Sequence, residues 1–256
     1  MILPLASGVF APMAPGDRPA CWAVTGRLGG HSVGEFSQAN IAPNVGDDPL
    51  ATSRNLNSFA SLVGVKEGDL ALMQAAHGSS IASVHGAGTF PSVDSLITDH
   101  EDVGLVAMGA DCVPLIFYAS REGDTPLISA VHCGWKGIVA GVVDATIAEL
   151  RVRGASHIQS VVGPAICGAC YSSAADRREL IRSSTQREVA EAVLRTPGGI
   201  DVREGVLTQL MSAGIEPVVV GGCTYENPET LFSYRRENRT GRQGIVVAMC
   251  ESQVPS

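Results

Sequence analysis

Short apolar runs that alternate with amphipathic segments are the feature that most constrains how this chain folds. Residues 103–108 and 113–118 each have the length and composition of a buried strand, and a turn containing Asp111 and Cys112 separates them. Further strands are predicted at 127–131, 158–162, 218–220 and 245–249. Strands that alternate with helices in this way are typical of a mixed α/β fold.

Apolar residues at helical spacing predict the helices between these strands. We expect helices over about 49–63, 137–153, 174–194 and 202–213. Gly64, Gly154 and Gly214 follow three of them, at the place where a left-handed residue commonly ends a helix. Residues 25–48 are rich in Gly, Asn, Ser and Asp and predict an ordered loop. No repeat or Pro-rich linker divides the sequence, so we expect a single domain over residues 1–256.

Charge and composition narrow the class of protein. A net charge of −8 and a pI near 5.2 do not provide the positive field that attracts phosphate backbones, so nucleic-acid binding is not expected. The N-terminus has no signal-peptide pattern, and no apolar run reaches the roughly 18 residues of a membrane span. We predict a cytoplasmic protein, without membrane association, whose seven cysteines are reduced thiols. Its sequence is compatible with a monomer or a homodimer.

Three residues that can bind metals lie where apolar segments meet turns. His77, Cys112 and His132 offer two imidazoles and one thiolate, which matches the three protein ligands of a catalytic zinc site. Zinc bound in this way lowers the pKa of a bound water to roughly 7. Spacing alone leaves a second interpretation open, because a single Cys after a strand is often a core residue and a single His in a turn is often solvated.

Several segments, in order along nearly the whole chain, resemble signatures of the YfiH family, also called the laccase-domain or polyphenol oxidase family and regarded as purine nucleoside-metabolising enzymes. They are TGRLGGHS at 25–32, NVGDDP at 44–49, ADCVP at 110–114, HCGWKG at 132–137, GPAI at 163–166, CT at 223–224, and FSYRR through TGRQ at 232–243. The resemblance implies a single α/β/α-layered domain of the YfiH-like (cytotoxic-necrotizing-factor-like) type. It also implies that His77, Cys112 and His132 bind the metal, zinc or alternatively copper.

The resemblance further implies phosphorolysis of adenosine, inosine and S-methyl-5′-thioadenosine, together with deamination of adenosine. Hydrolytic deamination suits a zinc site, whereas phosphorolysis needs cations that hold phosphate against C1′ of the ribose. The candidates are Arg235, Arg236, Arg242 and Lys136. An alternative is that Arg235 and Arg236 form an exposed basic strand end.

The chain departs from the family pattern at several positions, which we expect to affect substrate choice more than metal binding. Gln74 lies three residues before His77 rather than in the usual QVH segment, and Leu56 replaces the Arg of an NR pair. Ser172-Ser173-Ala174 replaces the usual acidic continuation after Cys170-Tyr171, and Lys136 replaces the commoner Arg.

The remaining cysteines and histidines of interest are expected to have structural roles or to be solvated. Cys167 and Cys170 form a CxxC that has neither a second CxxC nor a nearby pair of histidines, which favours a structural turn over a metal or redox site. We expect Cys133 to point away from the metal ligand His132, because adjacent residues of a strand face opposite sides. His85 and His100 are predicted to be solvated, and Asp111 either orients a ligand or caps a turn.

Three other functions remain open. Cys112 could be a nucleophile with His132 as its base, in a Cys–His hydrolase or an amidase that edits peptidoglycan precursors. Copper-dependent phenol oxidation is a second alternative, although one copper site lacks the clustered ligands of a four-electron oxidase. A non-catalytic partner protein is the third.

Overall fold

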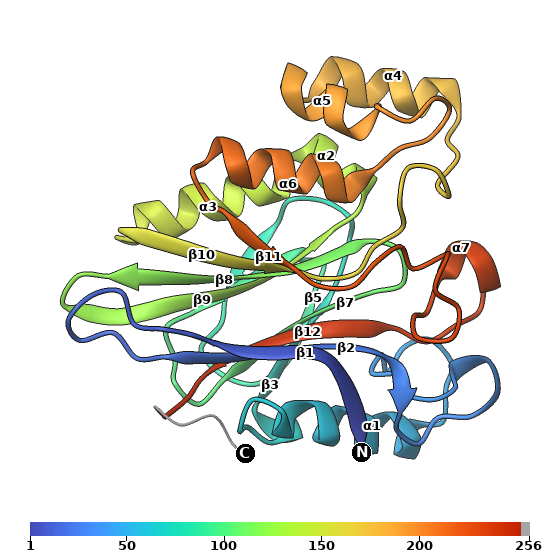
Figure 1. The fold of residues 1–256 in the computed structure, drawn as a ribbon. Helices are drawn as coiled ribbons and strands as arrows, with labels where there is room; N and C mark the ends of the chain where they lie inside the picture. Colours follow the sequence, from blue (N-terminus) through green and yellow to red (C-terminus); the bar gives the residue numbers. More distant parts are fainter. Residues whose placement is uncertain (252–256) are drawn as a thin grey trace.

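Two six-stranded sheets form the centre of the protein (Figure 1). The computed structural model describes residues 1–251. The first sheet has the order β1 (Ile2–Phe10), β2 (Ala20–Gly29), β12 (Gln243–Met249), β7 (Gly104–Gly109), β3 (Leu70–Gln74), β5 (Gly88–Pro91). The second has the order β11 (Pro217–Val219), β10 (His157–Val162), β8 (Val113–Arg121), β9 (Asp124–Cys133), β6 (Ser95–Thr98), β4 (Ile81–Ser83).

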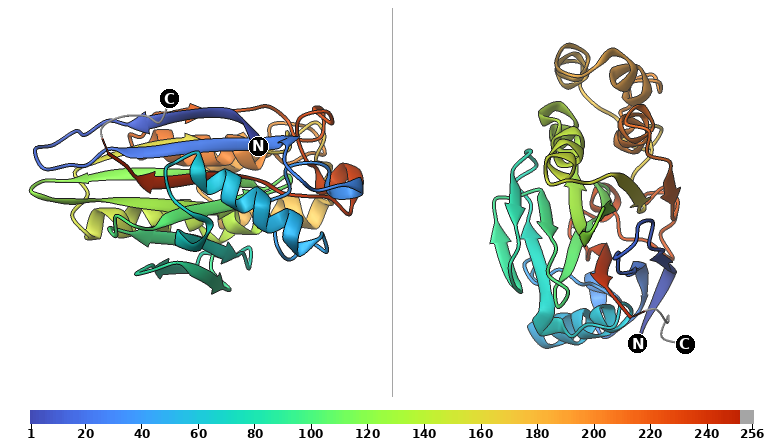
Figure 2. Two further views of the ribbon diagram at one scale, coloured as in Figure 1. Left: turned by 90° about the horizontal axis from the view of Figure 1, so that it is seen from below. Right: turned by 90° about the vertical axis from the view of Figure 1, so that its left-hand side faces the viewer.

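Apolar side chains between the sheets and outside them form the core. Leu105 and Ile245 of the first sheet pack in one cluster with Ile116 and Ile128 of the second. Helix α1 (Pro49–Ser61) covers the outer face of the first sheet, while α2 (Trp135–Ala140), α3 (Val142–Val152) and α6 (Val202–Ser212) cover the second (Figures 1 and 2). Helices α4 (Ala175–Ser184) and α5 (Arg187–Val193) lie beyond them. The mixed α/β class is confirmed, with two stacked sheets between the helical layers.

The strands predicted in the middle and at the end of the sequence are present as β7 to β12. The N-terminal strands β1 and β2 were not predicted, and the expectation of a loop that begins at residue 25 is wrong. Residues Thr25 to Gly29 continue β2, because β1 pairs with them along one edge and Arg27 donates its backbone N–H to Thr230 O at 2.8 Å. Tertiary pairing thus overrides the loop-like local composition.

Two predicted helices are interrupted. The helix expected after residue 137 is divided into α2 and α3 at Gly141, whose φ of 74° is left-handed. The helix expected over 174–194 ends at Thr185, which is extended, and α5 begins two residues later. The glycine stops at Gly64, Gly154 and Gly214 are confirmed by φ values of 80°, 94° and 78°. Within residues 1–251, no helix combines the length and apolar character needed to cross a bilayer.

Cys21 and Cys250 form a disulfide, so the prediction of seven reduced thiols is wrong for this pair. Cys21 lies in β2, and Cys250 directly follows the neighbouring antiparallel strand β12. This pairing sets their Cα atoms 5.7 Å apart, within the range that a disulfide spans. The other five cysteines are free thiols.

Candidate active site

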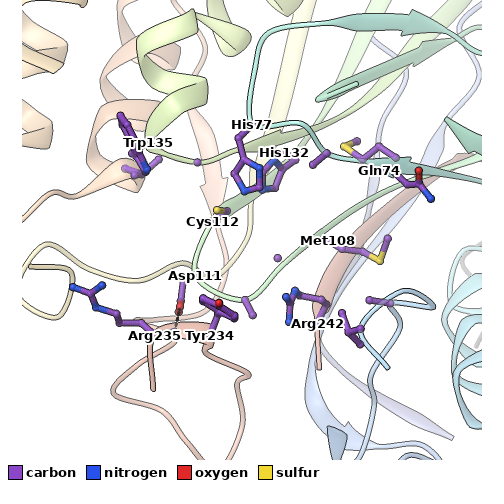
Figure 3. Close-up of a pocket in the computed structure, with 18 of the residues that line it drawn as sticks. Gln74, His77, Met108, Asp111, Cys112, His132, Trp135, Tyr234, Arg235 and Arg242 are labelled. Carbon is purple, nitrogen blue, oxygen red and sulfur yellow. Dashed lines mark hydrogen bonds between the residues drawn. The ribbon is translucent and has the colours of Figure 1, made fainter. Parts of the chain in front are cut away.

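His77, Cys112 and His132 meet at one end of the two sheets (Figure 3). Their nearest potential ligand atoms all lie within 4.8 Å of one another, and the two imidazole rings are perpendicular with centroids 4.8 Å apart. His77 lies between β3 of the first sheet and β4 of the second, and Cys112 lies between β7 of the first and β8 of the second. His132 belongs to β9. Two of the three residues therefore lie on crossovers between the sheets.

Asp94, which was not identified from the sequence, holds two of these residues in place. Its fully buried carboxylate accepts hydrogen bonds from the backbone N–H of Ala76, His77 and Gly78 at 3.2, 2.9 and 2.7 Å. The same carboxylate lies 2.9 Å from Nδ1 of His132. A carboxylate on one nitrogen of a histidine fixes the ring orientation and leaves the other nitrogen for a metal.

The backbone around the site is constrained. His77 and Asp111 have φ values of 61° and 109°, which are uncommon for residues other than glycine. The Asp94 bonds hold the His77 turn in this conformation. A Cβ at Gly134 would lie 3.0 Å from Cys112 Sγ and 3.2 Å from the His77 ring, so glycine at this position leaves the space beside these two side chains open.

The three side chains perturb one another electrostatically. Burial raises the pKa of Cys112, but the charge of His132 and hydrogen bonds from His132 and His77 outweigh it and lower that pKa to about 6. Burial lowers the pKa of His132, but the Cys112 thiolate and the hydrogen bond to Asp94 raise it to about 9. Each of the two groups thus favours the charged form of the other, the Cys112 thiolate and the His132 imidazolium.

These residues open into a cavity of about 650 Å³, which is in the size range of small-molecule sites. The rings of Trp135, Tyr171 and Tyr234 and the side chains of Met73 and Met108 line it. It thus combines aromatic and flexible apolar surface with the His–Cys cluster.

Three arginines also line the cavity. Arg242 and Arg235 were predicted from the sequence, and both reach the cavity (Figure 3). Arg235 Nη2 donates to Ser172 O and Oγ at 2.7 Å each, and burial lowers the pKa of Arg242. Arg177 was not predicted; it lies over the Trp135 ring with its Cζ 4.6 Å from the centroid. No sequence motif marks Arg177, because α4, the helix that carries it, lies outside the family signatures.

Two other predicted cations lie elsewhere. Arg236 donates to the backbone oxygens of Thr224, Tyr225 and Leu231 and to Glu237, and it does not line the cavity. Lys136 is exposed on α2 and is also absent from the lining, with its Nζ 5.8 Å from the Trp135 ring centroid. The structure therefore brings two of the four predicted cations to the site.

Asp111 acts as a cap and a link between segments. Its carboxylate accepts a hydrogen bond from Thr224 Oγ1 and one from the backbone N–H of Arg235 in the first turn of α7 (Tyr234–Glu237), both at 2.6 Å. These bonds join the Cys112 loop to the segment that carries Arg235. Of the two roles expected for Asp111, the structure supports the cap.

The positions that depart from the family pattern have distinct environments. Gln74 lines the cavity, but its side chain points away from the His–Cys cluster (Figure 3). Leu56 of α1 is buried in the core between this helix and the first sheet, and the neighbouring Asn55 donates to Ser32, Gln38 and Asn40. This part of α1 therefore stabilises the preceding loop and provides no cavity cation.

The other thiols and imidazoles lie apart from the site. Cys133 is fully buried in the core cluster beneath α2 and α3, as expected for the neighbour of His132 on a strand, and burial raises its pKa. His85 and His100 are exposed and pair with each other, with Nδ1 and Nε2 3.2 Å apart.

The donor set of the site fits a metal ion. Two imidazoles and a thiolate suit zinc or copper, and a tetrahedral zinc–thiolate geometry sets ligand atoms roughly 3.8 Å or less apart. The observed limit of 4.8 Å needs only a small contraction to reach this. The donors and the Asp94 bond to His132 support a metal but do not distinguish which one.

Comparisons with known proteins identify the family of this chain. A family model described as multi-copper polyphenol oxidoreductase laccase matches residues 21–250. A purine nucleoside phosphorylase of Corynebacterium glutamicum is 33% identical over 240 residues, covering 91% of this chain and 96% of the relative, and one of Streptomyces griseus is 33% identical over 236 residues, covering 90% and 94%. The fold is similar to crystal structures of Bacillus licheniformis YfiH (26% identity, TM-score 0.82, covering 90% and 93%) and Geobacillus stearothermophilus YlmD (29%, 0.81, 94% and 94%). The chain therefore belongs to the YfiH-like laccase-domain family.

Proposed function

We propose that this chain is a metal-dependent purine nucleoside phosphorylase that acts on adenosine, inosine and S-methyl-5′-thioadenosine and also deaminates adenosine. The observation that carries the proposal is one cavity that combines the His–Cys cluster, three aromatic rings and three arginines. Relatives at 33% identity are named purine nucleoside phosphorylases. Neither a cation cluster nor a metal site alone would favour this reaction over others.

Phosphate is the substrate that we assign to the arginines. Burial disfavours the charge of Arg242, and its Nη1 donates to Thr240 O and Gly241 O, which leaves Nε and Nη2 without a protein acceptor among residues 1–251. A guanidinium binds phosphate with two parallel hydrogen bonds, and an anion restores the interactions lost on burial. Held in this way, a phosphate oxygen attacks C1′ and forms the C1′–O bond, while the electron pair of the C1′–N9 bond leaves with the purine.

The aromatic and methionine side chains are assigned to the nucleoside. Trp135, Tyr171 and Tyr234 offer ring faces on which a purine stacks. Met73 and Met108 are flexible and polarisable, which suits the methylthio group of S-methyl-5′-thioadenosine as well as a 5′-hydroxyl. A metal held by His77, Cys112 and His132 would supply Lewis acidity and lower the pKa of water for deamination.

Product analysis tests this function. Adenosine with phosphate is expected to give adenine and ribose 1-phosphate, with inosine as a second product, when purified untagged protein is assayed by chromatography. Omitting phosphate should abolish adenine formation and leave inosine formation intact. Adenine release that does not depend on phosphate would contradict the assignment.

Arg242→Ala is expected to raise the KM for phosphate by about 10-fold or more, since a charge-assisted hydrogen bond contributes roughly 1.5–3 kcal/mol. Inosine formation should change much less, because deamination uses no phosphate. Lys136→Ala is the matched control, because Lys136 is exposed and outside the cavity. Equal phosphate KM values in the two variants would remove Arg242 from the phosphate site.

A second candidate function uses the same side chains without a metal. Cys112, His132 and Asp94 have the order of a Cys–His–Asp triad, with the thiol near the imidazole and the carboxylate on Nδ1. The lowered pKa of Cys112 is typical of a nucleophilic cysteine. The alternative is a Cys–His hydrolase or amidase.

Alkylation of Cys112 and removal of the metal together separate the two functions. In metal-free protein, Cys112 is a thiolate above its pKa of about 6, so iodoacetamide labelling should rise through pH 6 and level off, whereas an ordinary thiol keeps rising to about pH 9. His132→Ala should shift this midpoint upward. For the phosphorylase, a chelator abolishes activity and added zinc protects Cys112; for the hydrolase, iodoacetamide abolishes activity and a chelator does not.

Copper-dependent phenol oxidation receives less support. The described residues bring together two groups of three or more potential ligands, and these groups do not share residues. A four-electron oxidase requires several copper ions in one cluster, which the single His–Cys cluster does not supply.

A further inference from the structure

A second group of potential metal ligands, three thiols and one carboxylate, lies outside the lining of the cavity. Cys167, Cys170, Cys223 and Glu226 each place a potential ligand atom within 4.8 Å of the others. Their sulfur atoms and carboxylate come from two segments that are more than 50 residues apart in the sequence. Cys223 is buried, Cys167 and Cys170 are half-buried, and Glu226 is exposed.

The backbone holds these two segments together. Ala165 and Cys223 form a parallel bridge, and the Thr224 N–H donates to Ala165 O at 3.1 Å. The CxxC segment closes into a tight turn, because the backbone N–H groups of Cys170 and Tyr171 both donate to Cys167 O. The position of Cys223 beside the CxxC is thus set by main-chain bonds.

The contacts within the group orient the donors toward one another. The Cys167 N–H donates to Cys223 Sγ at 3.3 Å, and Cys170 Sγ lies 3.4 Å from Glu226 Oε1. The group therefore presents converging donors rather than separate core thiols.

We propose that Cys167, Cys170, Cys223 and Glu226 form a structural site for a zinc-like divalent cation, separate from the His77, Cys112 and His132 site. Three sulfurs and one carboxylate oxygen provide the four ligands of a closed tetrahedral site, and thiolates select soft cations over Mg²⁺ or Ca²⁺. Cys223 and Glu226 thereby supply the two further ligands that the CxxC lacks in the linear sequence. The site contains no open position for substrate, so its role is structural.

The cation would connect the two segments that support one wall of the cavity. Tyr171 follows Cys170 directly, and its ring lies 5.3 Å from the Arg235 guanidinium carbon. Arg235 follows the Cys223 segment and binds Ser172. Both Tyr171 and Arg235 line the cavity, so the site positions residues assigned to substrate without contacting substrate itself.

Metal content measures the second site independently of enzymatic activity. Untagged protein with Cys112→Ala, which lacks the sulfur ligand of the first site, is expected to keep one equivalent of zinc after dialysis against a weak chelator. Adding Cys167→Ser to this variant should remove that zinc. Glu226→Gln is the gentler change, because Glu226 is exposed; it should weaken zinc retention while leaving the circular dichroism spectrum unchanged.

Cobalt substitution identifies the donors. Co²⁺ added to metal-free Cys112→Ala protein is expected to give a sulfur-to-cobalt charge-transfer band, and Cys167→Ser should remove it. The proposal is overturned if Cys112→Ala protein binds neither zinc nor cobalt, or if native mass spectrometry of freshly purified protein shows Cys167 and Cys170 joined as a disulfide. Neither result would bear on phosphorolysis, which is tested separately.

Discussion

Cys112→Ala is expected to reduce both phosphorolysis and deamination of adenosine by more than about 100-fold, because outer-shell partners of metal ligands already contribute 10- to 100-fold and a direct ligand contributes more. Cys112 supplies the only sulfur among the three donors of the first site. Without it, two imidazoles remain and the affinity for zinc falls sharply. Steady-state assays of both reactions, combined with metal analysis of the same preparation, measure this effect.

Cys133→Ala is the matched control for this change. Cys133 is a buried neighbouring thiol that faces the helix-covered core and not the cavity. Its replacement is expected to lower stability while leaving both activities and the zinc of the first site near the wild-type level. Wild-type turnover in Cys112→Ala would refute the metal-dependent mechanism and the Cys–His hydrolase together.

Asp94→Asn is expected to weaken zinc binding at the first site, and both activities with it, by about 10- to 100-fold. The amide keeps the size of the carboxylate but loses the charge that interacts with His132 and offers only one acceptor oxygen to the three N–H groups at residues 76–78. The pKa of His132 should also fall, because the hydrogen bond and charge of Asp94 are among the causes that raise it. NMR titration of the His132 ring in metal-free protein tests this direction.

Asp17→Asn separates this effect from general loss of structure. Asp17 likewise accepts backbone N–H bonds, from Met13 and Ala14, and a side-chain bond from Ser120, but it does not line the cavity. It should lower the melting temperature without changing zinc affinity. Similar zinc affinities for Asp94→Asn and Asp17→Asn would show that Asp94 does not position the ligands.

The parts of the site carried by short motifs were predictable from the sequence. Cys112 directly precedes the apolar strand β8 and His132 lies at the end of β9, so their place at the sheet end follows from local pattern and from the family signatures. Asp94 could not be found in this way, because the sequence contains many acidic residues and its 38-residue separation from His132 has no periodic meaning. The grouping of Cys223 and Glu226 with the CxxC could not be predicted either, because only folding brings these segments together.

The fold was predictable where burial is strong. Strands β7, β8 and β12 are almost entirely buried and are recognisable as apolar runs. Strands β1 and β2 are harder to recognise, because exposed residues interrupt β1 and polar residues and glycines end β2. The division into two sheets also depends on pairings between distant strands, such as β12 with β2 and β7, which local patterns do not encode.

Because His77 and Cys112 lie on crossovers between the sheets, the proposed first metal site forms only when the two sheets are docked. One sheet alone cannot assemble the three ligands, so a partly folded chain with a single formed sheet has no site. Metal bound there would stabilise the docked arrangement against separation of the two sheets. Catalytic activity recovered during refolding should therefore report the final association of the sheets and not the formation of either one.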